Sequence, residues 1–506
     1  MTIRDEYLPD DAYLPDDDDL SDVPTTEDEN TTPAQVISLD DIRRRRGLDT
    51  IEDLFGLRFF APVNEGGKIK QRFLPELLAE EILAMGPLAL GDGGLIWAYR
   101  GGVWRISNHE IRDRATELLR EAYKPDRANA AEHHIQRMLR RDGMIIDCNN
   151  PPTDYINFKN GLLNWRTLEL APHTPDIRST IQLPVNWNPD ASCPEFEKFV
   201  QSVVPEDVVD TIWELIGYMM MTGNPLHKAV LLIGSGRNGK GTFLRVLTAL
   251  LGEENVSNVD LHTIASERFG VADLYNRLAN IAGDIDAKHL KETARFKQIT
   301  GEDKIYAEYK GKDGFNFKPF AVPIFSANEI PPSSDSSLGY LSRWLVIKFP
   351  YSFRGREDRT LTQRLTTPEE LEGIAFQAVL SLKMLMERGD FEMTKSLEEA
   401  FKEFHKANDP VLDWLTERCD INPDYPPCPI RRLYEDYKTW CFRNERKALS
   451  NRKFYERLES SHGFSRIKSH GVLSYRGIKL LPDDDENTSY GWSPDQPVDI
   501  AAALGS

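Results

Sequence analysis

The stretch GSGRNGKGT at residues 234–242 decides how this chain is interpreted. The apolar run AVLLI at 229–233 precedes it and predicts a buried strand, and FLRVLTALL at 243–251 follows with helical spacing. A strand, a glycine-rich turn and a helix in this order predict a phosphate-binding loop. The glycines let backbone N–H groups converge on phosphates, and the helix N-terminus adds its positive end. We expect the phosphates of ATP to be bound by Gly234, Ser235, Gly236, Arg237, Asn238, Gly239, Lys240, Gly241 and Thr242.

The residues after the loop lysine differ in one respect from the usual pattern. Lys240 supplies the positive charge for the β- and γ-phosphates. A Ser or Thr usually follows the lysine and binds Mg²⁺ through its hydroxyl, whereas here Gly241 follows and Thr242 comes next. Either Thr242 or a water molecule then contacts the metal. ATP and Mg²⁺ are the expected ligand and cofactor.

Two further apolar segments predict strands that end in polar groups. LANIAGDI at 278–285 is expected to be a neighbouring strand, with Asp286 directly after it. Asp284 and Asp286 are two residues apart, so in an extended segment both point to the same side. One acid would hold the metal and the other would orient water, and the sequence leaves open which, although Asp284 joins Thr242 as the candidate metal ligand. AVPIFSA at 321–327 leads to Asn328, whose amide can donate to phosphate and accept from the lytic water. An acidic loop is the alternative for the aspartates.

Three basic residues complete the candidate site. Arg343 stands just before an apolar strand and has the planar, permanent charge of an arginine finger, with a structural salt bridge as the alternative. Between the acidic strand and Asn328, IYAEY at 305–309 and FNFKPF at 315–320 predict a hairpin. Its turn carries Lys310 and Lys312, which would bind DNA phosphates without reading sequence. A solvated turn is the alternative.

The charge of the chain is distributed unevenly. The formal net charge is −19, of which residues 1–41 carry roughly −13 and residues 483–506 roughly −6. The region between them is therefore about neutral, and residues 430–479 hold an excess of roughly +8, which is typical of a phosphate-contacting surface. The five scattered cysteines, the absence of a basic and apolar leader and the lack of a long apolar run predict a cytoplasmic protein that does not enter a membrane.

These blocks together resemble the superfamily 3 helicase domain of the phage and plasmid primase-helicase family, which is related to the poxvirus primase-helicase. Weaker similarity covers INFKNGLLNW at 156–165 and the segment 368–388, so the resemblance spans about residues 95–480. Four segments carry most of it: GSGRNGKGTF at 234–243, RLANIAGDID at 277–286, FKQITGEDKIYAEYKGK at 296–312 and FSANEIPPSSDSSLGYLSRWLVIKFP at 325–350.

The resemblance implies an α/β fold with an AAA+ type P-loop core, assembled into a ring that is usually a hexamer and moves 3′ to 5′ on single-stranded DNA. Lys240, Asp284 and Asn328 would act in the subunit that holds ATP, and Arg343 on the ATP of its neighbour. The expected domains are a disordered acidic tail (1–48), a mixed α/β domain (49–195), the ATPase (196–395), a winged-helix DNA-binding domain (396–481) and a second acidic tail (482–506).

The function that this resemblance implies is an ATP-dependent helicase for phage, plasmid or mobile-element replication in a bacterial cytoplasm. Single-stranded and forked DNA would be its substrates. No cysteine cluster or pair of polymerase-like acids predicts a primase module, so a separate primase, a polymerase or a single-strand-binding protein is the expected kind of partner. An ATP-regulated origin-binding initiator, or the helicase portion of a primase-helicase system with a separate primase, is the alternative. A packaging or transposition ATPase is a third interpretation.

Overall fold

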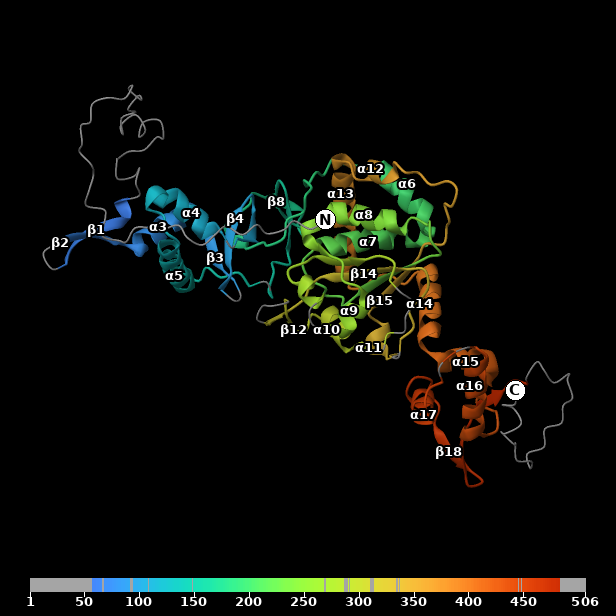
Figure 1. The fold of residues 1–506 in the computed structure, drawn as a ribbon. Coiled ribbons are helices and arrows are strands. Elements are labelled where there is room, and N and C mark those ends of the chain that lie inside the picture. Colours follow the sequence, from blue (N-terminus) through green and yellow to red (C-terminus); the bar gives the residue numbers. More distant parts are fainter. Residues whose placement is uncertain are drawn as a thin grey trace, which may run out of the picture.

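The computed structural model describes residues 57–482, except 66–67, 92–93, 108, 148, 268–269, 286–289, 291, 310–313, 334, 336, 445 and 447. Both acidic tails, Asp286, Lys310 and Lys312 therefore lie outside the described residues. Within the described residues, three packed bodies follow one another along the chain (Figure 1). None of the helices in the described ranges combines the length and the apolar character that a membrane crossing requires.

A parallel sheet of five strands forms the central body. Its order places the strand before the glycine loop, β9, between β14 and β15, with β11 and then β10 beyond β14. Because all the pairs are parallel, the carboxyl ends of the strands meet at one edge. In sheet order the strands are β10 (Val256–Ser257), β11 (Ala279–Ala282), β14 (Val322–Ala327), β9 (Ala229–Ile233) and β15 (Trp344–Lys348).

Helices cover both faces of this sheet, as its apolar strands require. Val230 and Leu232 of β9 contribute to one hydrophobic cluster, and Ala229 and Leu231 to another, because successive side chains of a strand point to opposite faces. The first cluster contains α6 (Pro194–Val203), α7 (Val209–Met220), α8 (Lys240–Leu251) and α13 (Pro368–Arg388), flanked by η5 (Glu206–Val208), η6 (Glu253–Asn255) and α12 (Leu361–Leu365). The second contains α9 (Leu261–Ser266), η7 (Gly270–Leu274), α10 (Ala294–Thr300), α11 (Leu338–Leu341) and α14 (Lys395–Asn408).

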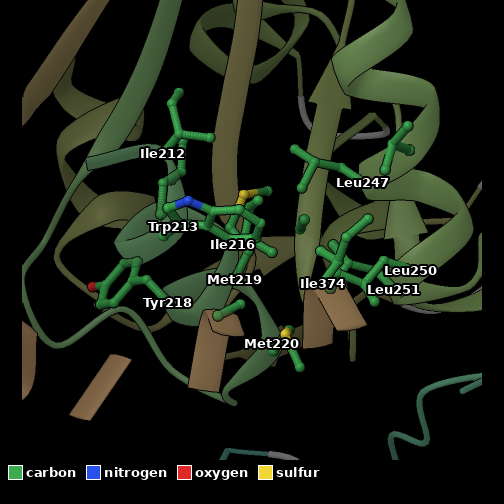
Figure 2. Packing of buried hydrophobic residues seen from close by; sticks show 14 of the residues in the cluster. Ile212, Trp213, Ile216, Tyr218, Met219, Met220, Leu247, Leu250, Leu251 and Ile374 are labelled. Atoms are coloured by element: carbon green, nitrogen blue, oxygen red, sulfur yellow. The ribbon is translucent and has the colours of Figure 1, made fainter. Parts of the chain in front are cut away.

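The first cluster includes a close approach between two helices. A Cβ atom placed on Gly217 of α7 would lie 2.1 Å from the carbonyl oxygen of Ala378 on α13, so only glycine fits there. Figure 2 shows the packing that results, with side chains of α7 gathered beside those of α8 and α13. The labelled residues are Ile212, Trp213, Ile216, Tyr218, Met219, Met220, Leu247, Leu250, Leu251 and Ile374.

The N-terminal body has a hydrophobic cluster of its own that ends at Leu139. Its elements are η1 (Leu57–Phe59), β1 (Phe60–Glu65), β2 (Lys68–Phe73), α3 (Pro75–Ala84), β3 (Leu88–Leu90), β4 (Ile96–Arg100), β5 (Val103–Ile106), α4 (Glu110–Leu119), η3 (Arg120–Ala122) and α5 (Pro125–Arg141).

The residues that follow the N-terminal body pack with the central body rather than with the N-terminal one. Buried residues of β6 (Tyr155–Phe158) and β7 (Gly161–Asn164) belong to the cluster of the central body. β8 (Glu169–Ala171) and η4 (Pro175–Ile177) complete the segment. The boundary expected at residue 195 therefore does not coincide with a boundary between hydrophobic clusters.

The C-terminal body is built around Trp414, Tyr437 and Phe454. The family resemblance also implies helices at Leu433–Asn444 and Ser450–Ser461, and the structure has α16 (Ile430–Arg443) and α17 (Asn451–Ser460) there. β18 (Arg466–Ser469) and β19 (Val472–Tyr475) form an antiparallel hairpin. The other elements are α15 (Pro410–Arg418), β16 (Cys419–Ile421), β17 (Cys428–Pro429) and β20 (Ile478–Leu480).

Candidate nucleotide-binding site

The glycine loop leaves β9 at the carboxyl edge of the sheet and ends where α8 begins, at Lys240. Gly239 is the N-cap of α8 and has a φ of 91°, in the left-handed region that glycine enters without strain. A Cβ atom at this position would also lie 2.6 Å from Cγ1 of Val203 on α6. Both the backbone and the space therefore require glycine. The first N–H groups of α8 have no partner within the helix and can bind an anion.

A hollow of about 450 Å³ opens at this helix end. Asp284, from the segment after β11, and Asn328, directly after β14, lie in its wall together with loop residues 236–242, whereas Gly234 and Ser235 are not in the wall. The structure thus brings together three segments that are far apart in the sequence. The complete lining is Gly236, Arg237, Asn238, Gly239, Lys240, Gly241, Thr242, Leu244, Arg245, Gly283, Asp284, Ser326 and Asn328.

Lys240 is only 4% exposed and is held by its own loop. Its Nζ donates to the carbonyl oxygen of Gly234 at 2.6 Å and to Oδ1 of Asn238 at 3.1 Å. Burial lowers the pKa of Lys240, and the negative charge of Asp284 partly opposes this shift. The ammonium group is therefore poorly solvated, and an added phosphate would interact with it strongly.

The expectation that Asp284 continues an extended strand is wrong. β11 ends at Ala282, and Asp284 has a φ of 50°, in the left-handed region. The N–H of Ile285 donates to the carbonyl of Ser326 at 2.9 Å, so the chain rejoins β14 one residue later. Aspartate tolerates this conformation better than most residues, and non-glycine residues in it cluster at functional sites. Asp286 lies outside the described residues, so the division of roles between the two acids stays a prediction.

The acidic strand is also not adjacent to β9, contrary to expectation, because β14 lies between them. This order places Asn328 beside the start of the loop, since the N–H of Gly234 donates to the carbonyl of Ala327 at 3.3 Å. Asn328 therefore sits between the loop and the acidic segment, where its amide can reach a group bound by either one.

Thr242 and Asp284 are the two oxygen-bearing side chains expected to meet Mg²⁺, and both line the hollow. The hydroxyl of Thr242 accepts from Nη2 of Arg245 at 3.2 Å, which leaves its lone pairs only partly used. Among the described residues, no group of three His, Cys, Asp or Glu side chains is arranged to hold a metal. One hydroxyl and one carboxylate fit a hard cation that keeps waters and shares phosphate oxygens.

Arg343 is not part of this hollow. It stands before β15 at the amino edge of the sheet, where its carbonyl accepts from the N–H of Ala229 at 2.7 Å. β15 is five residues long, so at ~3.3 Å per residue roughly 15 Å separate the two edges. In one subunit Arg343 therefore cannot reach the phosphate loop.

The expected hairpin between the acidic strand and Asn328 is present but shorter than predicted. It consists of β12 (Ile305–Ala307) and β13 (Phe315–Phe317), paired antiparallel. Its two lysines, Lys310 and Lys312, lie outside the described residues.

A second hollow of about 210 Å³ adjoins the first and was not anticipated from the sequence. It shares Arg237, Gly239 and Thr242 with the first hollow. Its walls come from α6 and from the segment after β15, which bonds to the loop through the N–H of Phe353 and the carbonyl of Arg237 at 2.8 Å. The added residues are Phe199, Ser202, Val203, Phe353, Arg356, Glu357, Asp358 and Leu361.

Sequence reasoning missed these residues because they are apolar or charged positions without a motif, and only the packing of α6 and the post-β15 segment brings them together. Arg245 was missed in the same way, although its place near the start of α8, just beyond the loop lysine, was a usable signal.

Comparison with known families matches three parts of the chain. Residues 86–205 match the family described as D5 N terminal like, and residues 406–468 match the family described as Poxvirus D5 protein-like. Residues 232–343 match a family of unknown function, DUF5906.

Among solved structures, the chain is similar to apo forms of the NrS-1 C-terminal region. One structure of the A form is 12% identical in sequence, with a TM-score of 0.46, and the alignment covers 80% of this chain and 99% of that one. Another apo structure of this region has a TM-score of 0.45 at the same identity, with the same shares of the two chains covered.

Proposed function

Because the chain is a relative of the phage and poxvirus-type primase-helicases, we propose that it is an ATP-dependent replicative DNA helicase of superfamily 3. One observation supports this proposal above the others. The glycine loop, Asp284 and Asn328 line one hollow at the carboxyl edge of a parallel sheet. The sheet, in which β14 with its terminal Asn328 lies between β9 and β11, also supports an AAA+ type core.

The proposed reaction is phosphoryl transfer from ATP to water. The N–H groups at the start of α8 and the ammonium of Lys240 bind the phosphates. Asp284, or Asp286, orients the attacking water as a base, and Asn328 bonds to the γ-phosphate and that water. Thr242 and Asp284 would hold Mg²⁺, which would supply positive charge for the phosphate oxygens. The guanidinium of Arg343 from a neighbouring subunit stabilises the charge that develops in the transition state.

The second hollow supports a nucleoside triphosphate as the ligand. Phe199 and Val203 face it from α6, and Phe353 and Leu361 line it from the segment after β15. Apolar walls next to a phosphate site suit a planar base, because such a base buries its faces against them. We place the adenine of ATP in this second hollow.

The separation of Arg343 from the hollow of its own subunit supports a ring. A guanidinium at the opposite edge of the sheet acts on ATP only if another subunit brings its phosphate edge there. We therefore propose a homo-oligomeric ring, a hexamer by the family resemblance, around single-stranded or forked DNA. A separate primase, polymerase or single-strand-binding protein would work with it in a bacterial cytoplasm.

Two parts of the chain are the proposed DNA contacts: the turn with Lys310 and Lys312, and the C-terminal body, which we assign as a winged-helix domain. The basic excess of that body is smaller than its sequence suggests. Residues 409–429 carry one Arg and five Asp or Glu, so the roughly +8 of residues 430–479 falls to about +4 for 409–479. Arg446 forms an ion pair with Asp413 at 2.7 Å, so its charge is less available to contact DNA phosphates.

A strand-displacement assay tests this function. The full chain should displace one strand of a forked duplex in the presence of ATP and Mg²⁺ but not with a non-hydrolysable analogue. The alternative, an ATP-regulated initiator, is favoured by the basic C-terminal body. An initiator would bind one duplex sequence tightly and displace little strand, and removal of residues 430–480 would abolish that binding while sparing ATP hydrolysis.

A further inference from the structure

The guanidinium of Arg343 is anchored along one side. Its Nε donates to Oγ1 of Thr300 at 2.9 Å, and its Nη1 donates to the carbonyl of Gly339 on α11. Within the part of the chain that the structure describes, Nη2 forms no hydrogen bond. A guanidinium held in this way has its plane set by two partners and keeps donors for an external oxyanion.

Thr300 is well suited to receive a hydrogen bond from Arg343. It ends α10 and is fully buried, and its Oγ1 lies 2.9 Å from the carbonyl of Phe296 in the same helix. A hydroxyl has one proton, and a guanidinium has donors only. The proton of Thr300 must therefore go to a backbone carbonyl of α10, which turns a lone pair toward Nε of Arg343.

A second contact fixes the backbone at the same point. The buried amide of Asn224 donates from Nδ2 to the carbonyl of Thr300 at 3.3 Å and to the carbonyl of Lys228 at 2.9 Å. Thr300 is thus held from the helix side and from the segment before β9. The hydroxyl that accepts the hydrogen bond from Arg343 therefore belongs to a backbone position that is fixed from two sides.

We infer that Thr300 is a positioning residue for Arg343 and sets the orientation in which its guanidinium meets the ATP of the neighbouring subunit. This inference rests on the proposed function, and specifically on the action of Arg343 between subunits. A misplacement of about 1 Å at a reacting group can reduce a rate by roughly a hundredfold. Loss of one hydroxyl should therefore lower kcat and leave the KM for ATP unchanged.

Mixed rings provide the test. Lys240→Ala and Arg343→Ala chains should each be inactive, whereas an equal mixture should recover part of the ATP hydrolysis. In a mixed ring, an intact Lys240 of one chain can meet an intact Arg343 of the other. Thr300→Val, which keeps the shape but removes the hydroxyl, is then added to one chain or to the other.

The placement of Thr300→Val separates positioning from general stability. On the Lys240→Ala chain, which donates Arg343, it should lower the recovered kcat roughly tenfold to a hundredfold. On the Arg343→Ala chain, which holds ATP, it should leave the recovered activity within about twofold, since that chain donates no arginine. Thr300→Ser on the donating chain should retain the activity because the hydroxyl remains.

Three results would overturn the inference. An equal loss in both placements would show that Thr300 only stabilises α10. An unchanged rate with Thr300→Val on the donating chain would show that Arg343 needs no anchor. A mixture without recovered activity would reject the action of Arg343 between subunits, and this inference with it. Thermal melting and light scattering of each chain would establish folding and ring assembly beforehand.

Discussion

The ammonium group of Lys240 lies 3.1 Å from the side-chain oxygen of Asn238, and Nδ2 of the same asparagine donates to the carbonyl of Phe349 at 3.2 Å. One side chain therefore links the loop lysine to the end of β15. This link positions the lysine before any phosphate arrives, so little ordering is left for the binding step.

Replacement of the loop lysine tests the phosphate site directly. Lys240→Ala should lower the kcat of ATP hydrolysis roughly a hundredfold or more, because a preorganised charge aimed at the transferred phosphate is lost. DNA binding, measured by fluorescence anisotropy without nucleotide, should stay within about twofold, since Lys240 is not one of the proposed DNA contacts. Lys198→Ala removes an exposed lysine of α6 and serves as the control. An unaffected hydrolysis rate in the Lys240 variant would reject the assignment of the loop.

The second hollow predicts a difference between ATP and a bare triphosphate. Ser202→Trp, at an exposed position that lines this hollow, should fill it and raise the Kd for ATP roughly tenfold, about 1.4 kcal/mol. The affinity for tripolyphosphate should not change, because the first hollow remains open. Isothermal titration with both ligands measures the two effects.

Gln201→Trp, at an exposed position of the same helix, is the matched control for this experiment. Equal weakening of ATP and tripolyphosphate by Ser202→Trp would indicate damage to the loop rather than a lost base site. Unchanged ATP binding would place the base elsewhere.

The two hollows differ in how well they could be predicted from the sequence. The meeting of the loop, Asp284 and Asn328 in the first hollow was predictable, because a glycine loop, an acid after a strand and an Asn after a strand are local signals and parallel pairing collects strand ends at one edge. The conformation of Asp284 was not predictable, since the residue leaves β11 and the chain rejoins β14 through Ile285. That return depends on a neighbour distant in sequence.

The order of the strands and the second hollow could not be predicted from the sequence, for a related reason. An apolar segment such as β14 shows that it is buried but not which strand lies beside it. Phe199 and Phe353 line one hollow only because α6 and the segment after β15 both pack beside the loop. In contrast, α16 and α17 were expected from the family resemblance, and in the structure each helix buries one continuous face.

The junction between the central and C-terminal bodies predicts a defined dependence on pH. Asp409 is fully buried, caps α15 through the N–H of Val411 and lies 3.1 Å from Nε2 of His462 and 3.4 Å from Arg457. Burial raises the pKa of Asp409, but the hydrogen bond from His462 and the charge of Arg457 lower it more, so the net pKa is below 3.8. A lowered carboxyl pKa stabilises the fold above pH 3.8, and this contribution is lost as the pH falls through the folded pKa.

Asp409→Asn should therefore destabilise the C-terminal body by about 3 kcal/mol at pH 7, because it leaves Arg457 without its partner charge while Asn still caps the helix. Urea unfolding followed by tryptophan fluorescence measures this loss, and the difference from the unsubstituted chain should shrink at a pH below the folded pKa of Asp409. A difference that is the same at both pH values would show that the charge of Asp409 contributes no stability.

The hairpin turn predicts a change in the salt dependence of DNA binding. If Lys310 and Lys312 each neutralise one phosphate, the double change to Ala should reduce the slope of log K against log salt by about 1.4, since each single-strand phosphate contributes roughly 0.7. Titrations of single-stranded DNA at several salt concentrations measure this slope, and ATP hydrolysis without DNA should be unaffected. Lys198→Ala with Lys402→Ala removes two exposed lysines from α6 and α14 and controls for net charge. An equal reduction of the slope in both double variants would mean that general charge, rather than the hairpin, binds the DNA.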